Sequence, residues 1–247
     1  MSFKKIFFTR RYPKIPFELR PVTSENYKDV AKLYADVFSE EAVNLYFKVT
    51  QKMLYDYDCL PMATECMKAN TGIACYDAEK NLLVGTLLYD DPIQLQDRFI
   101  NSENELTAKS CAFTKVYKEE NKELFDKLAK SKEGWLHGAG FSIHPEYQNF
   151  GIGKYMQYFS MFEHPVLKNV RYFTFDATST YSMKIAQQFQ FEEVWAKSWE
   201  DIAKIPGFEY YLGMIQGIRK MNLPFDEYYR LYLFDRNKAK PVEDPSS

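Results

Sequence analysis

Hydrophobic and polar positions along the chain follow two periods, and each period occupies its own segments. Strand-like patterns, either alternating or nearly unbroken apolar, occur at 17–23, 72–77, 82–89, 135–143, 171–177, 192–198 and 228–234. Apolar residues at helical spacing occur at 24–38, 42–55, 62–68, 151–162 and 181–189, with Ser24 as the expected cap of the first helix. Strands and helices alternate without a repeat or a linker, so we expect one α/β domain over residues 17–234.

The segment 90–134 interrupts this pattern, because it is polar and charged and lies between two predicted strands. It is too long for an unstructured loop in a compact domain. A helix over 114–130 is predicted, with Val116, Tyr117, Leu124 and Leu128 on its apolar face. The segment is thus an insertion in the domain, either a lid over a pocket or an excursion without function. Residues 1–16 and 235–247 are expected to be tails.

Composition excludes several classes of function. The 247 residues carry a net charge of -2, which gives no general attraction to nucleic acid or to an anionic membrane. No apolar run approaches the roughly 18 residues that cross a bilayer. The four cysteines form no CxxC pair and the three histidines lack metal-ligand spacing, so no metal site is expected. Unpaired cysteines fit a reducing compartment, and we expect a cytoplasmic protein.

Candidate chemistry begins with the stretch HPEYQNFGIGKYM, residues 144–156. Gly151 and Gly153 stand where the predicted helix starts, after the strand 135–143. The first turn of a helix has unpaired backbone N–H groups at its positive dipole end. Glycines there let a large anion approach the backbone, so this turn is a candidate phosphate or pyrophosphate site. An ordinary strand-to-helix turn is the alternative.

Two phosphate-binding motifs fail on this stretch. A P-loop requires glycine where Gln148 stands, and serine or threonine where Tyr155 follows the lysine. A dinucleotide fingerprint requires a third glycine, and Met156 occupies that position. What remains is the pattern Q-x-x-G-x-G, preceded by a strand and followed by a helix and the strand FTFDA.

This pattern resembles the acyl-CoA-binding motif [Q/R]-x-x-G-x-[G/A] of the GCN5-related N-acetyltransferase (GNAT) superfamily. The resemblance implies a mixed, mostly antiparallel central sheet with splayed central strands, flanked by helices, and acetyl-CoA as co-substrate. It implies that the two central strands part near Ser142, so that one of them pairs with the pantetheine arm. The implied cofactor-binding residues are Phe141, Ser142 and Ile143 for the pantetheine arm, and Gln148, Asn149, Phe150, Gly151, Ile152, Gly153 and Lys154 for the pyrophosphate.

Two further segments are similar to the insect-type arylalkylamine N-acetyltransferase branch. Many superfamily members have a tyrosine acid where this chain has Ala186. Instead, ATSTYSMKI resembles the Ser/Thr-rich segment of that branch, and FSEEAVN resembles its F-x-D-E-P-L-N. The resemblance implies catalytic roles for Glu41 as general base and for Ser182 and Thr178 near the thioester sulfur. A helix-start carboxylate and helix-capping hydroxyls are the alternatives.

His137 and His144 do not make a nucleophilic triad, since no G-x-S-x-G elbow and no acidic partner accompanies them in the sequence. The predicted function is therefore acetyl-CoA-dependent transfer of an acetyl group to a primary amine of a small molecule, with an arylalkylamine as one candidate. A protein or peptide N-acetyltransferase and a non-catalytic acyl-CoA-binding module remain as alternatives. No nucleic-acid or membrane partner is expected.

Overall fold

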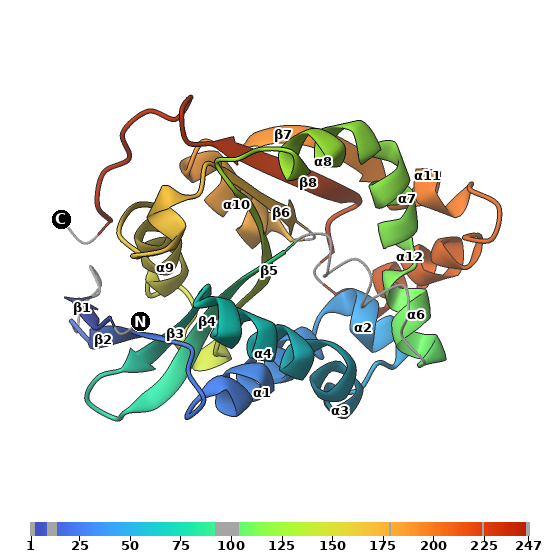
Figure 1. Ribbon diagram of the computed structural model, residues 1–247. Helices are drawn as coiled ribbons and strands as arrows, with labels where there is room; N and C mark the ends of the chain where they lie inside the picture. Colours follow the sequence, from blue (N-terminus) through green and yellow to red (C-terminus); the bar gives the residue numbers. More distant parts are fainter. Residues whose placement is uncertain (1–2, 9–13, 92–103, 178, 224, 246–247) are drawn as a thin grey trace.

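The computed structural model describes residues 3–8, 14–91, 104–177, 179–223 and 225–245 (Figure 1). The described strands form one eight-stranded sheet in the order β1-β2-β3-β4-β5-β6-β8-β7. The strands are β1 (Lys5–Phe8), β2 (Pro16–Pro21), β3 (Gly72–Asp77), β4 (Leu82–Asp90), β5 (Trp135–Ile143), β6 (Tyr172–Ala177), β7 (Glu192–Ser198) and β8 (Tyr228–Asp235). All neighbouring pairs are antiparallel except β5 and β6.

Helices cover both faces of this sheet. On one face lie α1 (Tyr27–Phe38), α2 (Ala42–Phe47), α3 (Gln51–Leu54), the π-helix η1 (Tyr55–Cys59), α4 (Leu60–Ala69), α6 (Glu105–Cys111), α7 (Phe113–Glu120), α8 (Lys122–Ala129), α11 (Trp199–Ala203) and α12 (Tyr210–Met221). On the other face lie α9 (Ile152–Phe162) and α10 (Thr180–Gln188), with the 3-10 turns η2 (Pro145–Tyr147) and η3 (Leu167–Asn169) nearby. Each face buries its own apolar core, so the sheet is the middle layer of the molecule.

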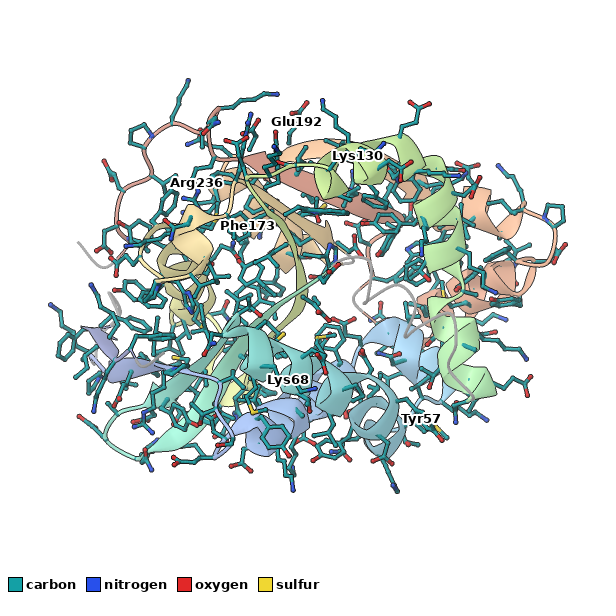
Figure 2. The ribbon with its side chains drawn as sticks, in the orientation of Figure 1. Tyr57, Lys68, Lys130, Phe173, Glu192 and Arg236 are labelled. Atoms are coloured by element: carbon teal, nitrogen blue, oxygen red, sulfur yellow. The ribbon has the colours of Figure 1, made fainter. Side chains whose placement is uncertain are left out.

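Side chains follow this layering. Phe173, on β6, is fully buried in the core beneath α9, and Figure 2 shows it in the interior of the molecule. The charged side chains Lys68, Lys130 and Glu192 are exposed, and Glu192 lies at the upper edge of the same view. Among the described residues, no helix is both long and apolar enough to span a membrane.

The two central strands part within the sheet. β5 pairs with β6 only from Trp135 opposite Tyr172 to Gly138 opposite Phe175. Beyond that point β5 continues to Ile143 in pairing with β4, while β6 continues to Ala177 in pairing with β8. We call the opening between the diverging strands the fork. The predicted fold class, a mixed and mostly antiparallel sheet with splayed central strands between helices, is confirmed.

An extra residue in β5 stands at the start of the fork. Leu88 of β4 is opposite Gly140, and Tyr89 is opposite Gly138, which leaves Ala139 as a bulge. A bulge bends the strand that carries it. The strands therefore separate directly after Gly138, earlier than the position near Ser142 that the family resemblance implied.

Several helices differ from the predictions. The helix expected over 42–55 is broken after Phe47, because Lys48 adopts a left-handed conformation with φ of 56°. The helix expected over 114–130 is broken at Asn121, whose amide donates to the carbonyl of Tyr117. The first helix begins at Tyr27 with Asn26 at the cap position, so Ser24 does not cap it.

Other elements were not predicted from the sequence. Strand β1 lies within residues 1–16, which were expected to be a tail, and it pairs with β2. Helices α11 and α12 follow β7, where no helix was expected. The inserted segment contributes α6, α7 and α8, and its Tyr117 and Phe125 are buried in the core. The described helices of the insertion therefore pack against the core as part of the domain.

Candidate active site

The loop before α9 carries the glycines of the candidate anion site. Gly151 is the cap residue of α9 with φ of 82°, a left-handed conformation that favours glycine. A Cβ atom built on it would meet no atom of the described residues within 4 Å, so that part of the structure leaves the space in front of this turn open. Asn149 is also left-handed, with φ of 66°. The chain therefore exposes its backbone on one side of the turn.

Backbone N–H groups converge on that open side. The first backbone hydrogen bond of α9 runs from Tyr155 N–H to the Gly151 carbonyl, at 3.1 Å. Within the described residues, the N–H groups of Ile152, Gly153 and Lys154 have no backbone acceptor. The Lys154 side chain lies in the same turn and makes no ion pair with a described residue. An anion placed here would meet N–H donors and a free cation.

The two glycines of the motif have different roles. A Cβ atom on Gly153 would stand 3.0 Å from the ring of Phe141 on β5 and 3.8 Å from Ile185 on α10. Gly153 thus allows α9 to pack closely on the sheet, whereas Gly151 provides the open left-handed turn. The sequence assigned both glycines to anion approach; the contact with Phe141 gives Gly153 a packing role as well, and the anion site at Gly151 stays a prediction.

Beyond the start of the fork, β5 offers unpaired main chain. Phe141, Ser142 and Ile143 pair with β4 on one side only, and no described strand pairs with their other side. The Ser142 hydroxyl is buried without a hydrogen-bond partner among the described residues. Gln148 closes the end of the strand by donating from Nε2 to the Ile143 carbonyl at 3.4 Å. An extended ligand could complete this edge as an additional strand does.

A chain of contacts leads from the β5 bulge to Glu41. The Tyr34 hydroxyl donates to the Ala139 carbonyl at 2.8 Å, and its ring packs against Phe38 with centroids 4.3 Å apart. The Phe38 carbonyl accepts from the Glu41 N–H at 3.1 Å and from Asn44 Nδ2 at 2.9 Å. Asn44 therefore fixes the turn that carries Glu41, and Tyr34 ties that turn to the start of the fork. Asn44 belongs to the segment FSEEAVN, but the sequence alone did not indicate that its side chain binds the Phe38 carbonyl.

Glu41 has the protonation behaviour of a candidate base. It occupies the cap position of α2, yet its side chain makes no capping hydrogen bond. It is partly shielded from solvent among apolar neighbours, and this burial raises its pKa from 4.5 to about 7. No described cation offsets that burial. A carboxyl group that titrates near neutral pH is suited to general acid–base chemistry.

The hydroxyl residues are placed less favourably. Ser182 and Ser179 form a capping box at the start of α10: each side chain accepts from the backbone N–H of the other, at 3.3 Å. The Ser182 hydroxyl also donates to the Ser179 carbonyl at 2.9 Å. Its one proton is thereby used within the cap. Thr178 lies outside the described residues, so its predicted role stays a prediction.

A polar cluster at the fork was not predicted from the sequence. His137 Nε2 lies 3.5 Å from Asp176 Oδ2, and His137 Nδ1 lies 3.0 Å from the Thr174 hydroxyl. Trp135 Nε1 donates to that same hydroxyl at 2.9 Å. The expectation that His137 has no acidic partner was therefore wrong, because β5 and β6 are distant in sequence and adjacent in the sheet. His144, as expected, has a local role: its Nδ1 accepts from Glu146 N–H at 3.3 Å.

The structure is similar to two solved N-acetyltransferases and to a solved condensation domain. Arylalkylamine N-acetyltransferase 2 from Aedes aegypti matches with a TM-score of 0.65 and 16% identity, over 89% of this chain and 98% of that one. The Drosophila melanogaster polyamine N-acetyltransferase matches with a TM-score of 0.62 and 10% identity, over 89% and 99%. The C-terminal condensation domain of Ebony, solved with β-alanyl-dopamine, matches with a TM-score of 0.66 and 14% identity, over 90% and 99%.

No family model and no curated protein matches the sequence. At 10–16% identity the structural matches establish the fold and leave the chemistry to the residues of this chain. The forked sheet with a helix starting on an open glycine turn is thus the fold of the GNAT acetyltransferases.

Proposed function

We propose that this chain is an N-acetyltransferase that moves the acetyl group of acetyl-CoA to a primary amine of a small molecule. The observation that carries the proposal is the placement of the open Gly151 turn beside the unpaired edge of β5. One feature fits a pyrophosphate and the other fits an extended amide-containing arm, and both belong to a CoA thioester.

The donor is held mainly by the backbone. N–H groups at the start of α9 would bind the pyrophosphate, with Lys154 adding charge. The main chain of Phe141, Ser142 and Ile143 would pair with the pantetheine arm, directing the thioester toward the fork. No metal is needed for this binding, because dipoles and one lysine supply the positive charge.

The acceptor needs a base. An amine is mostly protonated at neutral pH and must be neutral to attack a thioester carbonyl. Glu41, whose pKa is about 7, would take the amine proton directly or through water. Attack forms the carbon–nitrogen bond and releases the CoA thiolate when the carbon–sulfur bond breaks. The thiolate then takes a proton from solvent or from a nearby acid.

Arylalkylamines are the first candidates for the acceptor. Two structural neighbours are an arylalkylamine N-acetyltransferase and a polyamine N-acetyltransferase, and a third binds β-alanyl-dopamine. Aromatic rings gather beside the polar cluster: Tyr117 packs edge-on against Trp195 and Tyr229, with centroids 5.7 Å apart in both pairs. We also propose a cytoplasmic location, because Cys59 and Cys75 are buried thiols outside any disulfide, as a reducing compartment would keep them.

The proposal is tested by incubating the purified protein with acetyl-CoA and a panel of arylalkylamines, polyamines and peptides, and measuring free thiol. We expect thiol release with small amines. Release only with peptides would favour a peptide acceptor. Binding of acetyl-CoA without turnover over the panel would favour a non-catalytic module.

The donor site has a matched control in the chain. Gly207 has φ of 90° and open space around it, as Gly151 has, but it lies in the turn before α12. Valine at either position imposes the same kind of backbone strain. In calorimetry, Gly151→Val should weaken acetyl-CoA binding at least about 10-fold and Gly207→Val should not. Equal acetyl-CoA affinities of the two variants would exclude the proposed anion site at Gly151.

A further inference from the structure

The cluster at the fork contains two buried polar atoms with unused hydrogen-bonding capacity. Asp176 Oδ1 and the Tyr117 hydroxyl are both shielded from solvent and have no hydrogen-bond partner within the described part of the chain. Buried polar groups left without a hydrogen bond destabilise a protein, so a ligand that satisfies them gains affinity. Burial raises the pKa of the Tyr117 phenol well above its usual value, and the Asp176 carboxylate raises it further. The two groups are therefore neighbours within reach of each other, and neither Oδ1 nor the hydroxyl meets the full geometry of a hydrogen bond.

Asp176 stands where a ligand at the fork would pass. It is the first residue of β6 after Phe175, the last residue paired with β5. It shares a sheet face with His137 and Thr174, the face that α1 and α7 cover. Its side chain retains 23% exposure, although Oδ1 itself is buried. The side chain is thus partly accessible to solvent, with one of its oxygens buried.

The surrounding network fixes the orientation of this carboxylate. An indole N–H can only donate, so the Thr174 hydroxyl accepts from Trp135 and has its own proton for His137 Nδ1. His137 Nε2 faces Asp176 Oδ2, and the tautomer with its proton on Nε2 would donate toward that oxygen. One carboxylate oxygen is held by His137, and the other remains available. Residues of β5 and β6 thus orient the Asp176 carboxylate, and α7 of the insertion contributes the Tyr117 phenol.

We propose that Asp176 Oδ1 and the Tyr117 hydroxyl form the subsite that binds the protonated amino group of the acceptor. An ammonium donates up to three hydrogen bonds, which matches a carboxylate oxygen and a phenol oxygen that both lack donors. The aromatic rings beside Tyr117 add a surface that favours a cation or an aromatic ring. His137 is a positioning residue, which acts through Asp176.

In this proposal the subsite binds the amine, and Glu41 accepts its proton. A carboxylate beside an ammonium favours the charged form, so Asp176 serves recognition. Glu41 is on the α1–α2 turn, which Tyr34 connects to the carbonyl of Ala139 at the start of the same fork. A proton leaving the amine is accepted by Glu41, whose pKa is higher than that of an ordinary carboxyl. The inference rests on the proposed acetyl transfer and specifies its acceptor as a cation.

The test compares Asp176→Asn and Tyr117→Phe with the control Asp226→Asn. Asp226 is also a buried carboxylate with one oxygen lacking a hydrogen bond, but it lies before β8 beside Arg230. We expect Asp176→Asn to raise the KM for an amine acceptor about 10- to 100-fold, and Tyr117→Phe to raise it less. Acetyl-CoA affinity should stay at the wild-type value in both, and Asp226→Asn should change neither constant.

A second readout separates binding from folding. Tyramine and its neutral alcohol analogue, tyrosol, differ only in the group that the subsite would bind, and competition with the acceptor measures preference between them. Asp176→Asn should lose most of the wild-type preference for the amine. An unchanged KM and preference in a folded Asp176→Asn protein, with wild-type turnover intact, would overturn the subsite alone. Absence of acetyl transfer by the wild type over the whole panel would instead overturn the proposed function.

Discussion

His137 on β5 and Asp176 on β6 approach to 3.5 Å between Nε2 and Oδ2, at the point where the two strands separate. The parallel register brings them together, because it places His137 opposite Thr174, two residues before Asp176 on the same face. The main chain that we assign to the CoA arm begins directly beyond this pair. The proposed donor and acceptor sites therefore both adjoin one structural feature, the end of the β5–β6 pairing.

Glu41 should control the acid side of the pH–rate profile. At saturating amine, kcat should fall as pH decreases through about 7, because the carboxyl group becomes protonated and cannot accept a proton. Glu41→Gln should lower kcat about 100-fold or more and remove that limb. Glu40→Gln is the control, since Glu40 is the adjacent, exposed carboxylate. A wild-type profile in Glu41→Gln would exclude Glu41 as the base.

The same substitution should stabilise the protein at high pH. The folded-state pKa of Glu41 is raised above its unfolded value of 4.5, so between pH 4.5 and about 7 the folded protein keeps a proton that the unfolded chain has released. The free energy of unfolding therefore decreases as pH rises through this window. Glu41→Gln should be more stable than the wild type at pH 8, by up to about 3 kcal/mol, and the difference should shrink toward pH 5. Urea unfolding at both pH values measures it, and a pH-independent difference would contradict the raised pKa.

Ser182 should matter for the cap of α10 more than for chemistry. Ser179→Ala removes the acceptor for the Ser182 N–H, and Ser182→Ala removes the acceptor for the Ser179 N–H. Each variant should lose about 1 kcal/mol of stability. If capping is the main role of Ser182, the kcat values of the two variants should agree within about twofold. A much larger loss of kcat in Ser182→Ala alone would restore its predicted catalytic role.

The packing of α12 on α2 should be sensitive to one glycine. A Cβ atom on Gly217 would stand 2.4 Å from Cε2 of the Tyr46 ring, so Gly217→Ala must displace Tyr46 or the helix. We expect a loss of about 1–3 kcal/mol, with lower kcat because α2 follows directly after Glu41. Gly213→Ala is the control: its Cβ would meet only the Tyr46 hydroxyl at 3.1 Å, and alanine favours a helix. Thermal unfolding of both variants distinguishes a steric cost at Gly217 from a general intolerance of alanine in this helix. Equal melting temperatures of the two variants would exclude the steric cost.

Local pattern was sufficient for much of the fold. The alternating and unbroken apolar runs located β2 through β8, since side chains on a strand repeat every two residues. The apolar pattern did not predict the end of α2, because the left-handed residue there is Lys48 and no glycine marks the position. Strand β1 was missed because four residues carry too little periodicity, and it is held only by pairing with β2.

By itself, the sequence determined the open turn at Gly151, because a left-handed residue at a helix start selects glycine locally. It also placed Glu41 at the start of α2. Tertiary structure decided what these features adjoin. Only the sheet brings His137 to Asp176, only the packing of α7 adds Tyr117, and only burial gives Glu41 a pKa near 7. Distances between elements and exclusion of water depend on the whole fold, and the proposed acceptor site depends on both.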